Sequence, residues 1–202
     1  MTVVIGIRCK NGLVLACDSQ VEYYRGVYVK KLNANKIYPL SVANGHFFIG
    51  GAGKIADIEK LIAYIARSLE ETSRGSSLTS EDVYVTLEKT VTYLHKEYNI
   101  ERSRYLGYNV SPDDAPFFNP LAIVAGVLDI NGKYESLMVT IHPTGLVEPI
   151  ADYSTIGSGA AYAELMLKNL YSTELSVTSA IPLAIYVVEE VKSIDPSVGG
   201  DT

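Results

Sequence analysis

A threonine occupies the second position of the chain, directly before a strand-like run, and an N-terminal threonine can do hydrolytic chemistry. A hydroxyl becomes an effective nucleophile only when a neighbouring base accepts its proton. If Met1 is removed, Thr2 carries such a base in its own α-amine, whose ordinary pKa is about 7.7–8.0. Position alone favours the plainer interpretation, in which Thr2 is simply the second residue of an edge strand, so the rest of the chain must decide between the two interpretations.

The other reactive residue types form no metal or nucleotide pattern. Segment 51–56 fits the G-x-G-x-x-A pattern of dinucleotide sites, but we expect two helices to follow it, whereas such a site requires a helix and then a strand. We interpret it as a tight strand-to-helix turn, whose backbone N–H groups can approach a ligand. No spacing typical of zinc ligands is present among the three histidines, His46, His95 and His142. We predict neither a metal nor a cofactor.

The elements that position Thr2 begin with a hairpin. Strand-like runs over residues 3–10 and 13–17 flank Asn11-Gly12, and Asn-Gly between hydrophobic runs is a strong signal for a tight β-turn. In a two-residue hairpin of that register Cys9 faces Val14, which turns Cys9 and Cys17 to opposite faces of the sheet. We therefore expect two unpaired thiols that act as small core residues, consistent with a reducing compartment.

The rest of the chain groups its strands and its helices. Thr79 is expected to cap one helix with Asp82, and Thr178 another that has Pro182 in its first turn. This grouping favours an α+β fold in which two antiparallel sheets pack face to face between helices, as one domain over residues 1–202. The expected elements are three strands between residues 19 and 51, helices over 57–71 and 80–98, a polar loop over 102–120, an Asn-Gly hairpin over 121–142, one or two short strands over 146–156, and helices ending at 170 and 193.

Composition narrows the function classes. The chain has 202 residues, 48% of them hydrophobic, and a net charge of −6, which argues against a nucleic-acid surface. No apolar run reaches the ~18 residues of a membrane span, and the N-terminus lacks the pattern of a signal peptide. We expect a cytoplasmic protein with no nucleic-acid or membrane partner.

A set of short motifs, each weak alone, runs in order along nearly the whole chain and resembles the proteasome β-subunit family of N-terminal-nucleophile hydrolases. That family has a four-layer αββα sandwich, which agrees with the grouping above. The motifs are the opening T-V-V-I-G-I-x-C-K-N-G-L-V-L-A-C-D, Lys36-Ile37-Tyr38, Gly51-Ala52-Gly53-x-x-Ala56-Asp57, Val124-Ala125-Gly126-x-x-Asp129, Ile156-Gly157-Ser158-Gly159 and Asp195-x-x-x-Gly199-Gly200.

The resemblance implies a role for each matching residue. Thr2 falls on the nucleophile, Lys36 on the catalytic lysine and Asp18 on the aspartate that would hold this lysine in an ion pair. Gly53 would donate its backbone N–H to the oxyanion. Ser158 and Asp195 match the residues that tether the threonine amine. The substrate-pocket positions are Val21, Ala34, Gly51 and Ile55, none of them charged, which predicts a roomy pocket for apolar side chains.

The chain departs from the family at several positions. Val3 and Val4 replace threonines, and the segment between Asp18 and Lys36 is longer by two residues. Val198 stands where the family has a serine, and Ser197 is one place away. A missing hydroxyl there would remove a hydrogen bond of roughly 0.5–1.5 kcal/mol from the amine network. A retained Met1 would block the amine, and the family continues past the position of Thr202.

The resemblance implies a threonine-type endopeptidase whose substrates are unfolded polypeptides or peptides. Its partners would be further β-type subunits in a ring of six or seven, α-type rings and an ATPase unfoldase. Two alternatives stay open: a catalytically silent β-like subunit that only builds such a ring, and a different N-terminal-nucleophile amidase, because a fold does not fix a function.

Overall fold

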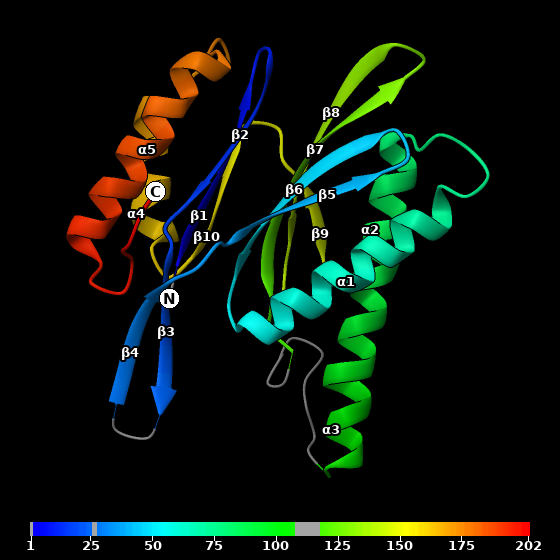
Figure 1. Cartoon of the computed structure of the whole chain (residues 1–202), viewed down its shortest axis with the longest axis horizontal. Helices are drawn as coiled ribbons and strands as arrows, with labels where there is room; N and C mark the ends of the chain where they lie inside the picture. Colours follow the sequence, from blue (N-terminus) through cyan, green and yellow to red (C-terminus); the bar gives the residue numbers. More distant parts are fainter. Residues whose placement is uncertain (1, 26–27, 108–117) are drawn as a thin grey trace.

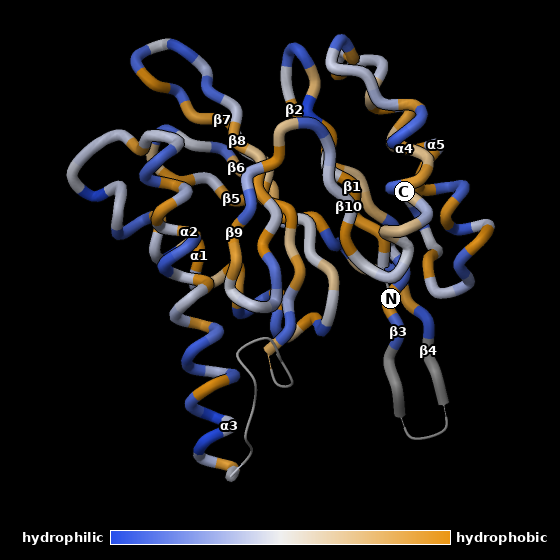
Figure 2. The backbone as a smooth tube through the Cα atoms, turned by 180° about the vertical axis from the view of Figure 1, so that it is seen from behind, coloured by the Kyte–Doolittle hydropathy of each residue, from blue (hydrophilic) through white to orange (hydrophobic). Residues whose placement is uncertain are grey.

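The computed structural model describes residues 2–25, 28–107 and 118–202, and shows two antiparallel sheets between two pairs of helices (Figure 1). Figure 2 shows that hydrophobic segments run along β1, β10 and the strands of the larger sheet. The α+β, four-layer arrangement expected from the grouped strands and helices is confirmed.

The smaller sheet has the order β10-β1-β2, and Thr2 lies directly before its central strand. β1 (Val3–Cys9) lies in the centre, between β2 (Gly12–Cys17) and β10 (Tyr153–Gly157), and pairs antiparallel with both. Nearly every residue of β1 is buried, because one face of this sheet packs on helices and the other on the second sheet. The N-terminal strand is therefore an internal element, held on both sides.

The larger sheet has the order β5-β6-β7-β8-β9. Its long central hairpin contains Asn131 and Gly132, both with positive φ (56° and 79°), as a turn of this type requires. The strands are β5 (Ile37–Val42), β6 (Gly45–Ala52), β7 (Leu121–Ile130), β8 (Lys133–Ile141) and β9 (Val147–Pro149). β9 and β10 are the one or two short strands predicted over residues 146–156.

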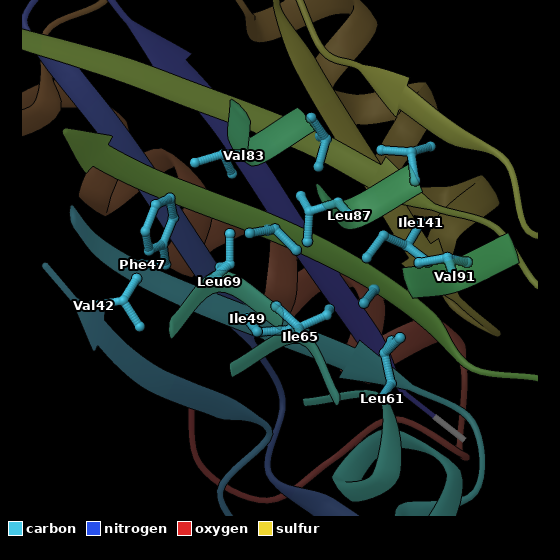
Figure 3. Close-up of a cluster of buried hydrophobic side chains, with 14 of the residues drawn as sticks. Val42, Phe47, Ile49, Leu61, Ile65, Leu69, Val83, Leu87, Val91 and Ile141 are labelled. Carbon is cyan, nitrogen blue, oxygen red and sulfur yellow. The ribbon is translucent and has the colours of Figure 1, made fainter. Parts of the chain in front are cut away.

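Two helices cover the outer face of the larger sheet: α1 (Ile55–Thr72) and α2 (Ser80–His95). Their apolar stripes meet side chains of the sheet, such as Phe47 and Ile49, in one buried cluster (Figure 3). The predicted capping box of Thr79 and Asp82 is present at the start of α2. Helical periodicity therefore located both helices within two or three residues of their observed ends.

The second pair of helices, α4 (Ala160–Leu170) and α5 (Val177–Ile194), packs on the smaller sheet. A third cluster of buried residues lies between the two sheets and includes Val4, Ile123 and Met138. Position 4 is thus in the centre of the molecule, where Val4 buries its whole apolar side chain.

The first hairpin turns one residue before its predicted position. The first hairpin turns at Lys10 and Asn11, so that Cys9 pairs with Gly12 and not with Val14. The shift from Val14 to Gly12 is two residues, which preserves the face of every side chain, and Cys9 and Cys17 point to opposite clusters as expected. Both thiols are free.

The number of strands between residues 20 and 52 and the first residue of helix α5 also differ from the prediction. Three breaks divide residues 20–52 into four strands, not three, and the added pair is β3 (Gln20–Arg25) with β4 (Tyr28–Asn33). Helix α5 begins at Val177 because Ser176, not Thr178, caps it by accepting from Ser179 N. Pro182 therefore lies in the second turn of α5 and not in the first.

The α-helix predicted over residues 80–98 ends at His95, and helical structure of other kinds continues past residue 98. A π-helical turn (Lys96–Glu101, labelled η1) follows α2, and α3 (Arg102–Tyr105) follows this turn. The turn contains Asn99, which is fully buried, and the amide of Asn99 exchanges two hydrogen bonds of 2.9 Å with the backbone of Phe118. The polar loop predicted over residues 102–120 is thus helical at its start, and its part at 108–117 lies outside the described residues.

The β3–β4 ribbon extends away from the two sheets, beside the N-terminus (Figure 1). Within the ranges that the structure describes, no helix is long and apolar enough to span a membrane.

Candidate active site

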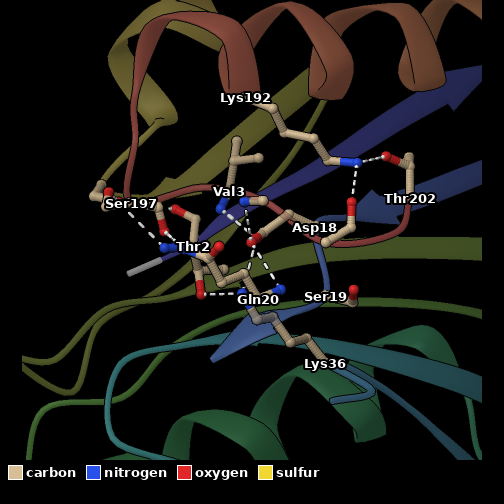
Figure 4. Close-up of polar contacts among 12 residues, drawn as sticks. Thr2, Val3, Asp18, Ser19, Gln20, Lys36, Lys192, Ser197 and Thr202 are labelled. Atoms are coloured by element: carbon tan, nitrogen blue, oxygen red, sulfur yellow. Dashed lines mark hydrogen bonds and ion pairs between the residues drawn. The ribbon is translucent and has the colours of Figure 1, made fainter. Parts of the chain in front are cut away.

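The hydroxyl of Thr2 meets the side chain of Lys36 in the interior of the protein. Lys36 Nζ donates to Thr2 Oγ1 over 2.7 Å, and to Asp18 Oδ1 over 2.9 Å (Figure 4). All three residues are buried: Thr2 is 6% exposed, Lys36 5% and Asp18 0%. One ammonium group therefore links a hydroxyl, which can be a nucleophile, to a carboxylate that balances its charge.

The backbone holds the carboxylate of Asp18 in place. Asp18 follows β2, and its Oδ1 accepts from Val3 N at 2.9 Å. Its Oδ2 accepts from Gln20 N and Gly199 N, both at 3.2 Å. A buried carboxylate with one ion pair and three backbone donors is well satisfied, which compensates for its removal from water.

The environment acts on Lys36 in two directions. Burial lowers the pKa of its ammonium below the ordinary value of 10.5, while the hydrogen bond and the negative charge of Asp18 oppose that shift. The backbone is fixed as well, because Lys36 O accepts from Gly51 N at 3.0 Å. This places a lysine of lowered pKa within hydrogen-bond distance of a hydroxyl, the arrangement that stabilises a developing alkoxide.

Three polar side chains lie on the other side of Thr2, at its nitrogen. Thr2 N donates to Ser158 Oγ at 3.2 Å, and Ser158 Oγ lies 3.2 Å from Ser197 Oγ. Ser197 Oγ in turn donates to the carboxylate of Asp195. Hydrogen bonds from Ser197 are the main reason why the pKa of Asp195 lies below its ordinary value of 3.8. The order along this network is Thr2, Ser158, Ser197, Asp195.

An open cleft of about 1040 Å³ adjoins Thr2 and Lys36. It lies between β3, the end of β6 and the start of α1. Four residues predicted for substrate or oxyanion binding line it: Val21, Gly51, Gly53 and Ile55. Gly53 has φ of +125° at the strand-to-helix turn, and a Cβ there would lie 2.9 Å from the carbonyl oxygen of Asn119. Only glycine fits this turn without strain.

Ala34 does not line this cleft. Its N–H donates to Ser19 O at 2.8 Å, and Ala34 faces a separate apolar groove of about 350 Å³ with Cys17 and Ile181. Asp18 contacts the cleft residue Lys36 directly, and Asp195 is connected to the cleft residue Ser158 through Ser197. Ala34 lies outside the cleft, in the separate groove. The predicted site residues that line the cleft are Thr2, Val21, Lys36, Gly51, Gly53, Ile55 and Ser158.

The cleft also contains charges that the predicted pocket positions do not show. Glu22, Glu59 and Lys54 line it together with the apolar side chains. Glu22 is paired with Lys31 at 3.6 Å, and its side chain is 8% exposed. An apolar pocket with charged walls therefore describes the cleft better than a wholly apolar one.

Sequence reasoning assigned no role to Ser197, Gln20 and Gly199. Gln20 Nε2 donates to Ser197 O at 3.1 Å, and Gln20 N donates to Gly199 O at 2.8 Å. The only sequence signal was the spacing of Ser197, two residues after Asp195. The segment 195–200 thus supports both sides of Thr2, with Ser197 on the nitrogen side and Gly199 on the side of Asp18 and Lys36.

The two sheets between helix pairs, with Thr2 directly before the central strand β1 of one sheet and the buried Lys36 directly before β5 of the other, define the N-terminal-nucleophile hydrolase fold. Solved structures agree: the ancestral β-subunit Anbu from Yersinia bercovieri aligns with a TM-score of 0.72 at 18% identity, covering 98% of this chain and 78% of Anbu. A Gly-1 mutant of Anbu from Hyphomicrobium sp. strain MC1 aligns with a TM-score of 0.73 at 18% identity, covering 99% and 78%.

The chain belongs to the proteasome subunit family, whose model, described as "Proteasome subunit", matches residues 2–112, more than half of the sequence. Its relatives include the proteasome subunit beta of Nanoarchaeum equitans, 29% identical over 91% of this chain and 81% of the relative. The proteasome subunit beta 2 of Pyrobaculum neutrophilum is 28% identical over 97% and 83%. A proteasome subunit alpha, from Methanococcus vannielii, is 26% identical over 100% and 71%.

Proposed function

We propose that this chain is a β-type proteasome subunit that hydrolyses peptide bonds with Thr2 as the nucleophile, after Met1 has been removed. The observation that carries the proposal is the sharing of Lys36 Nζ between Thr2 Oγ1 (2.7 Å) and Asp18 (2.9 Å), at the wall of an open cleft. Asp18 alone balances the charge of Lys36, so the added hydrogen bond from Lys36 to the Thr2 hydroxyl is better explained by catalysis than by charge balance.

The first half of the reaction forms an ester. The free α-amine of Thr2 accepts the proton of its hydroxyl, and Oγ1 attacks the carbonyl carbon of the peptide bond. The Lys36 ammonium stabilises the developing alkoxide, and the backbone N–H of Gly53 donates to the oxyanion of the tetrahedral intermediate. The Thr2 ammonium then gives its proton to the leaving amine, and the C–N bond breaks.

The second half releases the acyl group. Water attacks the ester carbon while the same amine accepts a proton from that water, and the C–O bond to Thr2 breaks. The released alkoxide oxygen of Thr2 takes the proton from the ammonium, which restores the hydroxyl and the free amine. Peptide segments are the substrates, and Val21, Gly51 and Ile55 contact the side chain next to the cleaved bond.

The assembly expected for this subunit is a ring with further β-type subunits, stacked on α-type rings and served by an ATPase unfoldase. Its support is the family membership, since both alpha and beta proteasome subunits are among the relatives. Ring assembly would close the cleft of each subunit into a compartment that folded proteins cannot enter.

A Thr2→Ala variant tests the proposed nucleophile. Thr2 is only a small buried residue at the start of β1, so we expect the variant to fold and assemble while peptide hydrolysis is lost. Thr2→Ser, which keeps the hydroxyl and the amine, is the matched control and should retain part of the activity. Substantial turnover by pure Thr2→Ala protein would overturn the assignment.

A further inference from the structure

Ser197 links the carboxylate of Asp195 to Ser158 by hydrogen bonds, and Ser158 itself also contributes to lowering the pKa of Asp195. Ser197 Oγ donates to Asp195, and Ser197 N donates to Asp195 Oδ1 at 2.9 Å. On its other side Ser197 Oγ lies 3.2 Å from Ser158 Oγ, which accepts from Thr2 N at 3.2 Å. Ser197 is only 8% exposed, so little water competes with these hydrogen bonds.

We propose that Ser197 is a positioning residue that connects the Thr2 nitrogen, through Ser158, to the negative charge of Asp195. The proposal deepens the proposed function and rests on it. It also changes the expectation from the sequence, in which the absence of a serine at position 198 leaves the amine network one hydroxyl short.

The hydroxyl contacts are compatible with this role. Ser158 Oγ accepts from Thr2 N–H, and its own proton has two acceptors within reach, Ser197 Oγ at 3.2 Å and Thr2 O at 3.4 Å. When Ser158 donates to Ser197, which donates to Asp195, the chain ends on an ionised acceptor and stabilises a positive charge at its start. The Thr2 amine becomes positively charged when it takes the hydroxyl proton, and the relay would favour that state.

The side chain of Val198 points elsewhere. Val198 is 3% exposed within the cluster between the smaller sheet and helices α4 and α5. A Cβ on Gly159 would meet Val198, Val191 and Val3, which locates Val198 among apolar groups. Position 198 is therefore a packing position here, and the hydroxyl comes from the residue before it.

Gln20 fixes the backbone of the relay. Its side-chain amide donates to Ser197 O at 3.1 Å, and its own N–H donates to Gly199 O at 2.8 Å. Figure 4 shows Gln20, Ser197 and Thr2 among the residues of this polar network. Gln20 thus holds the backbone at Ser197 and at Gly199, and this fixes the orientation of the Ser197 side chain.

The test uses full protein whose chain is made to begin at Thr2 by cleavage of a fusion. Ser197→Ala should lower kcat for a fluorogenic peptide by about 10- to 100-fold with little change in KM, because the hydrogen bonds lost serve a charge that forms during the reaction. Ser197→Thr, which keeps the hydroxyl, should restore most of the rate. Ser193→Ala, which removes an exposed hydroxyl at the end of α5, should change nothing.

A second readout does not need peptide hydrolysis. Competitive acetylation of the Thr2 amine across a pH series gives its pKa, and Ser197→Ala should lower that pKa by about one pH unit, since the ammonium loses its link to Asp195. Ser197→Ala/Val198→Ser should stay as low as Ser197→Ala, because position 198 faces apolar groups. An unchanged amine pKa in Ser197→Ala would overturn the role of Ser197, whereas activity of Thr2→Ala would overturn the proposed function instead.

Discussion

Lys36 Nζ lies 2.7 Å from Thr2 Oγ1, and the same nitrogen lies 2.9 Å from Asp18 Oδ1. The two contacts come from residues that are 34 and 18 positions apart along the chain. They meet because Lys36 is anchored beside β6 through Gly51 N, while Asp18 is anchored beside β1 through Val3 N. Each sheet therefore contributes one partner.

Removing Lys36 should affect both rate and stability. Lys36→Ala leaves Asp18 as a buried charge without its counterion, which costs roughly 3–5 kcal/mol when a pair is broken in this way. The three backbone donors to Asp18 should keep the loss of unfolding free energy near the lower value. We expect peptide turnover to fall by orders of magnitude, measured by steady-state kinetics and urea unfolding.

The control for this change is Lys10→Ala at the exposed first hairpin, which should leave both quantities unchanged. Near-normal turnover by Lys36→Ala would mean that the hydrogen bond to Thr2 Oγ1 has no catalytic role.

The turn at Gly53 should not accept a side chain. Gly53→Ala would place Cβ 2.9 Å from Asn119 O at a φ of +125°, a backbone conformation that costs of order 1–3 kcal/mol for other residues. The N–H proposed for the oxyanion would move with the backbone, so we expect kcat to fall about 100-fold. Gly75→Ala is the matched control, since a Cβ at Gly75 has nothing within 4 Å. Equal kcat for the two variants would remove Gly53 from the mechanism.

The wall of the cleft makes a prediction about cleavage preference. Ile55 lines the cleft and Ala34 lies in the separate groove. Ile55→Ala should change the ratio of kcat/KM for peptides with large and small apolar residues at the cleaved bond by about 10-fold or more. Ala34→Ser should leave that ratio unchanged. A larger effect from Ala34 than from Ile55 would contradict the placement of the substrate in this cleft.

The thiol of Cys17 should react slowly with alkylating reagents, although it lies close to Lys36. Burial is the largest cause that raises its pKa to about 11, and the positive charge of Lys36 only partly opposes the rise. At pH 8 about one thiol in a thousand is then thiolate, and only the thiolate reacts. In a Cys9→Ala background, alkylation by iodoacetamide at pH 8 should be at least about 100-fold slower than for the same chain in urea. Similar rates in both states would show that the thiol is not held in the groove.

Local patterns predicted most of the fold. The apolar stripe with Leu61, Ile65 and Leu69 located α1, because a helix that covers a sheet must repeat its apolar residues every three or four positions. The first hairpin differed from its prediction because the side chain of Asn11 also accepts a hydrogen bond from Val177 N at 2.9 Å, at the start of α5. A contact 166 residues away cannot be read from a turn signal.

The site was predictable only where a residue is fixed by a motif. Thr2, Asp18 and Lys36 stand next to strong strand patterns, and the structure brings these three side chains together, while their catalytic roles stay a prediction. Ala34 lies in the separate groove, where its backbone N–H donates to Ser19 O, and no local sequence pattern records this contact. Ser197 was assigned no role since its contact with Ser158 spans 39 residues and depends on how segment 195–200 lies against Gln20.

In the proposed mechanism, the free α-amine of Thr2 is the base that accepts the proton of the Thr2 hydroxyl. While Met1 remains attached, the nitrogen of Thr2 is part of an amide, which has no basic lone pair to accept the hydroxyl proton. Turnover should therefore depend on how much of the protein begins at Thr2.

The most direct measurement is the intact mass of several preparations, from fully retained to fully removed Met1, set against peptide turnover in each. Turnover should rise in proportion to the fraction of chains that begin at Thr2, and it should be absent when Met1 is fully retained. Full turnover by a preparation in which every chain keeps Met1 would contradict the N-terminal threonine mechanism.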